Sequence, residues 1–541
     1  MKKLIIITMS ILLTLSFLGI GCSSPTSSPA TITTQPTIST TPTSSQVSTT
    51  MAKATPQTST APASSKYGGV LYWGGTQKLT NLSHIGYQSA IADATYGKPA
   101  LESLIDVSHG EYIPQLAEKW DIAPDGKSIT FYLRKGVKYH DGTDFNAQAV
   151  KYVIDIARTG DNTSLRGITS VDVIDDYTVR FNMNQWDWVV MNSLAISIVG
   201  KMPSPTSLQK YTREELAYRA VGTGPFKFKN YVRDTSLTYE RFENYWQKGL
   251  PYLDSIEFRI YADPTTALLA LKAGEIQKLS ITIQDVEDLK KSGFNIIDYA
   301  GDITTLVPDG KNADSPFSDI RVRQAVSYAI NRELLAKSLG KGYYKPTYQP
   351  FDTTCWAYNP DIIGHPYSPQ KAKELLAEAG YPNGFKTRII VSGASSELHV
   401  ALQDMLRQVG IDVEIQEVTS PKYMEMSSKG WNGLLNAGVI RWGDHADPVQ
   451  SLYANYMGGH AQVSVFYPNE LKELYFQMRT TPDIETRNKL MQKVTKDIVD
   501  TYCMVIHMYV GRTVVALNPK VHDPNIADSF RGFVENIWIE R

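Results

Sequence analysis

The sequence predicts an α/β fold, and three observations lead to this prediction. In the first half, the segments 128–134 and 177–183 alternate apolar and polar residues, which is typical of half-buried strands. In the second half, strand and helix patterns alternate at short intervals, as in 387–415. About 475 residues follow Lys66, which is too many for one simple domain, so we expect two large lobes or one lobe with insertions.

The first half is predicted to be rich in strands, with two clear helices. The helix over 146–157 has a single apolar face, and the next begins at Pro264 and ends before Gly274, the usual placement of Pro and Gly at helix ends. The strands expected here are 68–73, 128–134, 177–183, 236–241 and 255–261.

The second half is predicted to alternate strands and helices. Asp319 and Ser368 stand where helix caps are expected, each followed by an apolar stripe at helical spacing. Because the joints between 387–391, 398–410 and 411–415 are short, these segments predict a parallel strand pair with a right-handed crossover. The apolar run 434–440 predicts a buried strand.

The N-terminus has the features of an export signal. Two lysines precede an apolar stretch over 4–20, and small residues then lead to Cys22. Gly21 fits the position before a lipidated cysteine, whereas Gly19 stands where leucine is usual. We therefore expect residues 1–22 to form a lipoprotein signal peptide that ends at a lipidated Cys22.

The segment 23–66 is predicted to be a disordered linker. It consists almost entirely of Ser, Thr, Pro, Ala and Gln and has no acidic residue. Such a segment cannot bury enough apolar surface to offset the entropy lost on ordering. We interpret it as a spacer between a membrane anchor and the body that follows.

Charge and hydropathy exclude two classes of protein. The chain has 54 basic and 55 acidic residues, and no basic block is present, which argues against a nucleic-acid partner. After the N-terminal stretch, no apolar run approaches the ~20 residues that a spanning helix needs. The body is expected to work outside the cell, held at the outer face of a membrane.

No motif in the chain indicates a catalytic site, a metal site or a cofactor site. Phosphate-binding loops of the Gly-x-x-x-x-Gly-Lys type, Gly-x-Ser-x-Gly elbows and His-x-x-x-His pairs are all missing from the sequence. We therefore predict no catalytic residue, no metal site, no cofactor and no enzyme activity. Cys355 and Cys503 could pair, although the apolar run around Cys503 favours a buried free thiol.

Two short motifs invite a functional interpretation but fit turns better. Asp141-Gly142 follows a strand and has turn chemistry, and Asp144 or Asn146 can cap the next helix. Gly222-Thr223-Gly224-Pro225 lacks the third glycine of a nucleotide loop, and its proline removes an amide donor. We predict a tight turn before the strand that starts at Phe226.

Several longer segments resemble one family. The stretches 116–120, 124–127 and 131–142 are similar to the signature of the bacterial extracellular solute-binding proteins of family 5, which include dipeptide, oligopeptide and nickel receptors of ABC importers. The resemblance covers most of the body in the same order, and it continues through 222–228, 244–254, 270–276, 319–333 and 367–384.

This resemblance implies a two-lobed, periplasmic-binding-protein-like fold with its ligand cleft between the lobes. It implies that lobe I spans 67–300 with an inserted subdomain, that lobe II spans 301–499, and that 500–541 returns to lobe I. The strand-rich first half and the α/β second half fit this architecture without establishing it.

The resemblance also points to a ligand-binding segment after the strand 434–440. In peptide-binding members, an aspartate in a matching Gly-Asp-x-x-Asp-Pro segment receives the α-ammonium of the ligand, and that aspartate maps onto Asp444. The alternative is a loop carboxylate held by a protein group. Arg441 could hold an anionic ligand group or pair with Asp444, and Trp442 could stack on a ligand or pack on the hinge. Asp447 precedes a proline and is expected to cap a helix.

Three further aromatic residues are candidate ligand contacts, namely Trp73, Trp356 and Tyr358, and packing in the core is the alternative for each. Dipeptide receptors place an arginine near the strand–helix junction of the second lobe. The corresponding segment here, 391–397, has none. This departure argues against a strict dipeptide receptor and leaves longer peptides, a sugar oligomer or a metal chelate.

The resemblance implies a substrate-binding lipoprotein that captures a peptide or similar solute by closure of its lobes. Its partners would be the ligand, an ABC permease and ATPase complex, and the membrane through Cys22, with the protein itself a monomer at the extracytoplasmic face. Two alternatives stay open at this point. One is a surface-anchored hydrolase or chaperone-like peptide binder, and the other is a solute sensor.

Overall fold

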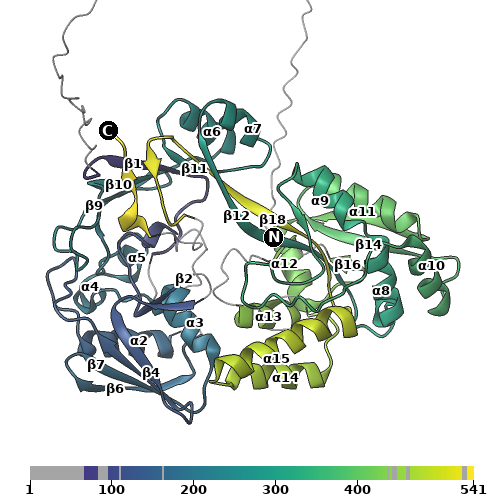
Figure 1. Ribbon diagram of the computed structural model, residues 1–541, viewed down its shortest axis with the longest axis horizontal. Coiled ribbons are helices and arrows are strands. Elements are labelled where there is room, and N and C mark those ends of the chain that lie inside the picture. The colour runs from purple at the N-terminus through teal and green to yellow at the C-terminus, as the bar shows by residue number, and fades with distance from the viewer. Residues whose placement is uncertain are drawn as a thin grey trace, which may run out of the picture. The chain divides into compact units, whose positions relative to one another are not determined.

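The computed structural model describes residues 66–82, 95–108, 111–160, 164–435, 438–440, 448–457, 463–526 and 533–541 (Figure 1). The signal peptide, Cys22 and nearly all of the predicted linker lie outside the described residues. None of the described helices is long and apolar enough to cross a membrane. In the part described, helices and strands mix throughout, as expected of an α/β protein.

One mixed sheet passes through most of the body. Its first part holds parallel neighbours β10 and β11 on either side of β1, followed by antiparallel β9 and β8. Helix α6 contacts β1 and β11, and α7 contacts β12. The bounds are β1 Val70–Gly75, β8 Phe226–Val232, β9 Ser236–Arg241, β10 Ser255–Ile260, β11 Lys278–Ile281, α6 Pro264–Lys272 and α7 Val286–Lys291.

The second part of the sheet holds the predicted strand–helix–strand unit. β14 and β15 are parallel and pair in full register from Phe385↔Ile411 to Ser392↔Val418, which confirms the prediction of a parallel pair. The bounds are η2 Pro316–Ser318, α8 Ile320–Ala329, α9 Arg332–Gly340, β13 Lys345–Pro346, α10 Pro369–Glu378, β14 Phe385–Ser392, α11 Glu397–Arg407, β15 Ile411–Val418 and α12 Ser420–Lys429. The strand predicted over 434–440 is described as two short strands, β16 Leu434–Leu435 and β17 Gly438–Ile440.

Two long antiparallel strands join the two parts of the sheet. β12 (Asn295–Pro308) pairs with β18 (Ile506–Leu517) along nearly its whole length, and the register shifts between Ala300 and Ile303. At this bulge a Cβ on Gly301 would lie 2.9 Å from the backbone nitrogen of Thr513. Only glycine lets the two strands approach so closely here. The bulge lies next to the predicted boundary at residue 300, and the predicted lobe limits themselves stay a prediction.

A separate four-stranded antiparallel sheet, in the order β4-β5-β7-β6, is inserted between β1 and β8 in the chain. Helix α2 packs on β6 and β7. Asn146, one of the two residues predicted as the cap, caps α2 by accepting from the Ala149 N–H at 3.0 Å. The bounds are β2 Ile105–Ser108, β3 Glu111–Pro114, β4 Ala117–Ile122, β5 Ser128–Leu133, α2 Ala147–Thr159, β6 Ile168–Asp175, β7 Thr178–Met183, α3 Trp188–Ile196, η1 Ile198–Gly200, α4 Pro205–Lys210 and α5 Arg213–Leu216.

The last third of the chain adds a helical hairpin and the C-terminal strands. α14 and α15 pack on each other, and α14 lies beside α3 (Figure 1). The bounds are α13 Pro448–Tyr456, α14 Asn469–Thr480, α15 Ile484–Lys496, the π-helical turn η3 Asp497–Thr501, β19 Val521–His522, η4 Val534–Asn536 and β20 Trp538–Ile539.

Candidate functional site

Trp73 lies on β1, between the parallel strands β10 and β11. Its indole packs against Phe258, with ring centroids 5.1 Å apart. Lys278 Nζ lies 3.6 Å from the centroid of the Trp73 ring, a cation–π contact. The side chain is half-buried, and its contact with a ligand stays a prediction.

A buried ion pair that the sequence did not reveal lies against Trp73. Lys278 Nζ is 2.6 Å from Asp523 Oδ2, and the two side chains are only 6% and 1% exposed. Burial lowers the pKa of Lys278, and the charge and hydrogen bond of Asp523 oppose this effect. Asp523 Oδ1 has no hydrogen-bond partner among the described residues. The two residues are 245 positions apart and neither belongs to a motif, so no sequence signal pointed to them.

Trp356 and Tyr358 lie in the loop between β13 and α10 and have different partners from Trp73. The guanidinium carbon of Arg487 is 4.1 Å from the Trp356 ring centroid. Tyr358 donates its N–H to the Cys355 carbonyl at 3.0 Å, and both aromatic side chains pack, half-buried, on the largest apolar core. Each is therefore part of the protein's own packing, and ligand contact by either residue stays a prediction.

The segment with Arg441, Trp442 and Asp444 lies outside the described residues, as does the predicted cap Asp447. Its flanks are described. Before it, Ile440 of β17 pairs with Ile303 of β12, directly at the bulge. After it comes α13, whose Tyr456 hydroxyl lies 2.7 Å from His507 Nε2 on β18. The strand before the predicted ligand-binding segment and the helix after it therefore both contact the two long strands.

The strand–helix junction that lacks an arginine is occupied by serines that bond within the protein. The Ser395 N–H donates to Glu417 at 2.8 Å, and Ser396 Oγ lies 3.1 Å from His399 Nδ1. Ser392 and Ser420 hydroxyls are 3.2 Å apart. These groups bond to one another, and the segment 391–397 itself contains no lysine or arginine.

The turn at Gly222–Pro225 has a structural role, because it anchors a buried carboxylate. Thr223 Oγ1 and the Tyr245 hydroxyl each donate to Glu102 at 2.8 Å, and Trp246 Nε1 donates at 3.0 and 3.1 Å. Burial raises the pKa of Glu102 to about 7, although hydrogen bonds from these three side chains lower it, and nearby Glu535 raises it further. Glu102 was missed because its partners are more than 120 residues away in the chain.

The described residues include no grouped metal ligands, and their two cysteines are buried. Among them, no cluster of three or more His, Cys, Asp or Glu side chains could hold a metal ion. Cys355 and Cys503 are free and buried, as predicted for Cys503. Burial raises the pKa of their thiols to about 12 and about 11, so neither is a ready nucleophile at neutral pH.

Comparison with known proteins identifies the family. The family described as bacterial extracellular solute-binding proteins, family 5 Middle, matches residues 111–462, more than half of the chain. Haem-binding protein A of Haemophilus influenzae is 32% identical over 426 residues, which cover 70% of this chain and 76% of that protein. Glutathione-binding protein GsiB of Pectobacterium atrosepticum is 35% identical over 325 residues, which cover 58% of this chain and 63% of that protein, less than two thirds of its length.

Solved structures agree with this assignment. The periplasmic binding protein DppA of Helicobacter pylori, in complex with the peptide STSA, is 27% identical, with a TM-score of 0.72 over 88% of this chain and 99% of that chain. CtaP of Listeria monocytogenes, at 22% identity and a TM-score of 0.78, shares the fold. These matches confirm the predicted two-lobed α/β fold, and the related proteins are solute-binding proteins rather than enzymes. This chain belongs to the bacterial extracellular solute-binding proteins of family 5.

Proposed function

We propose that this protein is the substrate-binding component of an ABC importer and that it captures a peptide or similar small solute between its two lobes. The observation that carries the proposal is the similarity to the peptide-bound Helicobacter protein, which extends over 99% of that chain at 27% identity. Binding without turnover is proposed because the relatives are solute-binding proteins.

The ligand is proposed to be larger than a dipeptide or to lack a free carboxylate at the second lobe. Support comes from the segment 391–397, which has no arginine and whose serines bond to neighbouring side chains. A peptide held along its main chain needs no such cation. Asp444 is proposed to receive the ligand's amine, because a carboxylate and an ammonium form a charge-assisted hydrogen bond.

The closing lobes are proposed to hand the solute to a membrane permease while Cys22 holds the protein at the extracytoplasmic face. The proposed lobes are 67–300 with 500–541, and 301–499. Lipidation can be tested directly, because globomycin blocks the peptidase that processes lipoprotein signals. Processing that is insensitive to globomycin, or a mature N-terminus other than Cys22, would contradict the anchor.

The binding proposal is tested by mass spectrometry of solute that copurifies with the full-length protein, followed by thermal unfolding with reduced glutathione and with the peptide Ser-Thr-Ser-Ala. A solute that binds only the folded state raises the melting temperature. Asp444→Ala should weaken binding of a peptide by more than tenfold, whereas Asp447→Asn, which keeps a capping side chain, should leave the affinity unchanged. A protein with no copurifying solute, and no response to peptides, sugars or metal chelates, would overturn the importer assignment.

A further inference from the structure

A compact polar contact joins α3 to the helical hairpin α14–α15. Asp187, directly before α3, receives two hydrogen bonds from Arg479 at the end of α14, with Nε–Oδ1 2.8 Å and Nη2–Oδ2 2.6 Å. The two side chains are 15% and 21% exposed. Burial lowers the pKa of Arg479, but the hydrogen bonds and charge of Asp187 outweigh this effect and raise it above its ordinary value. A two-point pair of this kind fixes both the distance and the orientation of the two elements.

The next residue extends the contact. Trp188 is 1% exposed, and its Nε1 donates to the Thr481 carbonyl in the turn between α14 and α15 at 2.7 Å. The guanidinium carbon of Arg487 on α15 lies 4.2 Å from the Trp188 ring centroid and 4.1 Å from that of Trp356. The same cation therefore contacts an indole from each of two distant chain segments. Tyr112 on β3 stacks on Trp188, with its ring 6° from parallel.

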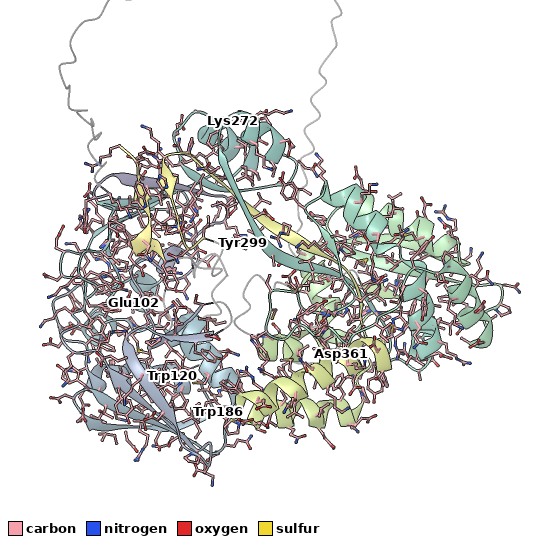
Figure 2. All side chains as sticks on the ribbon, in the orientation of Figure 1. Glu102, Trp120, Trp186, Lys272, Tyr299 and Asp361 are labelled. Carbon is pink, nitrogen blue, oxygen red and sulfur yellow. The ribbon has the colours of Figure 1, made fainter. Side chains whose placement is uncertain are left out.

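Close packing around a glycine completes the contact. Gly126, in the turn between β4 and β5, has a φ of +66°, and a Cβ there would lie 2.9 Å from the Cβ of Trp186 and 3.2 Å from Cγ of Pro482. Figure 2 labels Trp186 beside α3, near the helical hairpin. The family-like segment 124–127 thus supplies a glycine where the hairpin turn meets the inserted sheet. We call the contacts made by Gly126, Asp187, Trp188, Arg479 and Arg487 the α3 latch.

The α3 latch is linked to the predicted ligand-binding segment through α13. This helix begins at Pro448, directly after the segment 441–447, and it contacts α3. The Tyr475 hydroxyl of α14 donates to the Val449 carbonyl at 3.1 Å. Arg479 itself lies 5.7 Å from the Tyr453 ring centroid. A shift of α13 would therefore move groups that contact α14 and Arg479, and so disturb the Asp187–Arg479 pair.

We propose that the α3 latch holds the two lobes together and sets how long a captured solute stays bound, a role that rests on the proposed function above. The latch joins elements from the chain regions proposed as lobe I and lobe II, which β12 and β18 also connect through the bulge at Gly301. A contact that forms only when the lobes are together increases the fraction of protein molecules in that binding-competent form. The apparent affinity rises in proportion to that population, without any contact to the solute.

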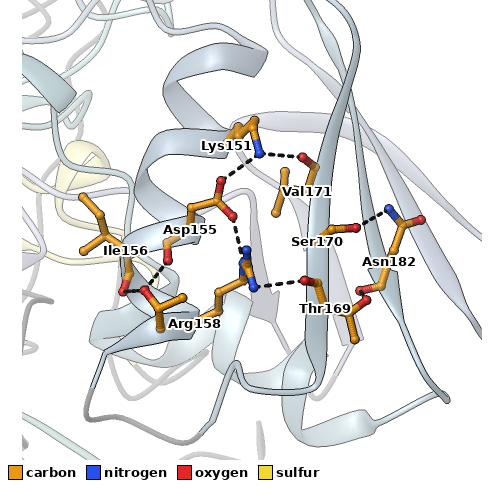
Figure 3. A network of polar contacts seen from close by, with 9 residues as sticks. Lys151, Asp155, Ile156, Arg158, Thr169, Ser170, Val171 and Asn182 are labelled. Carbon is orange, nitrogen blue, oxygen red and sulfur yellow. Dashed lines mark hydrogen bonds and ion pairs between the residues drawn. The ribbon is translucent and has the colours of Figure 1, made fainter.

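The test separates latch opening from solute binding. Arg479→Met removes the cation and leaves the Asp187 charge unpaired. It is therefore compared with the double variant Asp187→Asn/Arg479→Met, which removes both charges of this pair. In the parent protein the Val189 N–H donates to the Asp187 side chain at 2.9 Å, and the side-chain oxygen of asparagine can accept the same bond and cap α3. The matched control is Arg158→Met, which breaks the Asp155–Arg158 pair (2.8 Å) inside the inserted subdomain (Figure 3).

Spin labels are attached through Ile174→Cys and Ile484→Cys, two exposed positions, in the full chain carrying Cys22→Ser. They report the distance across the α3 latch. The buried thiols of Cys355 and Cys503, whose pKa values are raised, will not take up the label. In the ligand-free protein the double variant should show a longer and broader distance distribution than the parent, and Arg158→Met should not. Unchanged distances in the double variant, with circular dichroism that confirms folding, would overturn the proposal.

The second arm measures the dissociation rates of reduced glutathione and of Ser-Thr-Ser-Ala. The double variant should release a bound probe at least tenfold faster than the parent, whereas Arg158→Met should release it at the parent rate. Equal release rates would also overturn the latch. If neither probe binds the parent protein, the result counts against the proposed ligand class alone, and the label distances still decide whether the α3 latch joins the lobes.

Discussion

Replacing Glu102 by glutamine should remove a pH-dependent loss of stability from the protein. Glu102, which is labelled in Figure 2, is 3% exposed. It accepts hydrogen bonds from the side chains of Thr223, Tyr245 and Trp246. These three groups donate to the carboxylate, but burial is the largest effect and raises its pKa from 4.5 to about 7. Glutamine keeps the shape and one acceptor oxygen, and it cannot ionise.

The magnitude follows from the two pKa values. Because the pKa of Glu102 is higher in the folded state, the folded protein binds more protons than the unfolded chain between pH 4.5 and about 7. The stability contribution is therefore fully present below pH 4.5 and is lost as the pH rises through 7. The difference between 4.5 and about 7 corresponds to about 3 kcal/mol in the free energy of unfolding. Above pH 8 the loss should be complete.

The assay is urea unfolding of the parent and of Glu102→Gln between pH 4.5 and pH 8.5. The free energy of unfolding of the parent should fall relative to that of the variant by about 3 kcal/mol across this range. Glu535→Gln should reduce the fall, because Glu535 raises the pKa of Glu102. Glu243→Gln, at an exposed position of the same region, should follow the parent. Parallel pH profiles of the parent and Glu102→Gln would refute the assignment of a raised pKa to this carboxyl.

Two further changes test other buried features. Lys278→Met should destabilise the protein by about 3–5 kcal/mol, because Asp523 would be left as a buried, uncompensated charge; adding Asp523→Asn should recover much of the loss in urea unfolding, and a single variant as stable as the parent would show that the pair contributes nothing. Gly126→Ala should lower stability by about 1–3 kcal/mol through strain at positive φ and crowding against Trp186. Gly142→Ala, also at positive φ but with no atom within 4 Å of the added Cβ, should cost less, and equal losses of melting temperature would remove the crowding argument.

Sequence patterns correctly predicted the elements that are defined by residues close together in the chain. The apolar face of α11 and the alternation in β15 are set by residues only a few positions apart, so strand, helix and strand were found with nearly the observed bounds. The same holds for the Asn146 cap, which acts on a backbone group three residues on. The strand predicted over 434–440 is found on both sides of residues 436 and 437, which lie outside the described residues, because β16 and β17 both pair with β12.

Contacts between distant segments gave no sequence signal. Asp187 and Arg479 are 292 positions apart, and each taken alone resembles an ordinary helix-end residue. Glu102 stood outside every motif considered, although its partners Tyr245 and Trp246 lie within a segment that resembles the family. The family pattern therefore marked residues that maintain the fold, and their role became apparent only when the folded chain placed a carboxylate beside them.

The aromatic candidates show why residue type alone is a weak guide to a ligand contact. An indole offers a flat apolar face with negative π density, and this face can contact either a ligand or a cation of the protein itself. Trp73 lies against Lys278, and Trp356 lies against Arg487, so in both residues an internal cation already contacts the ring. An unmet hydrogen-bonding group is a stronger indicator, because a buried polar atom without a partner costs free energy until something donates to it. By that criterion Asp523 Oδ1, which has no partner among the described residues, marks the environment of Trp73 more sharply than the indole itself does.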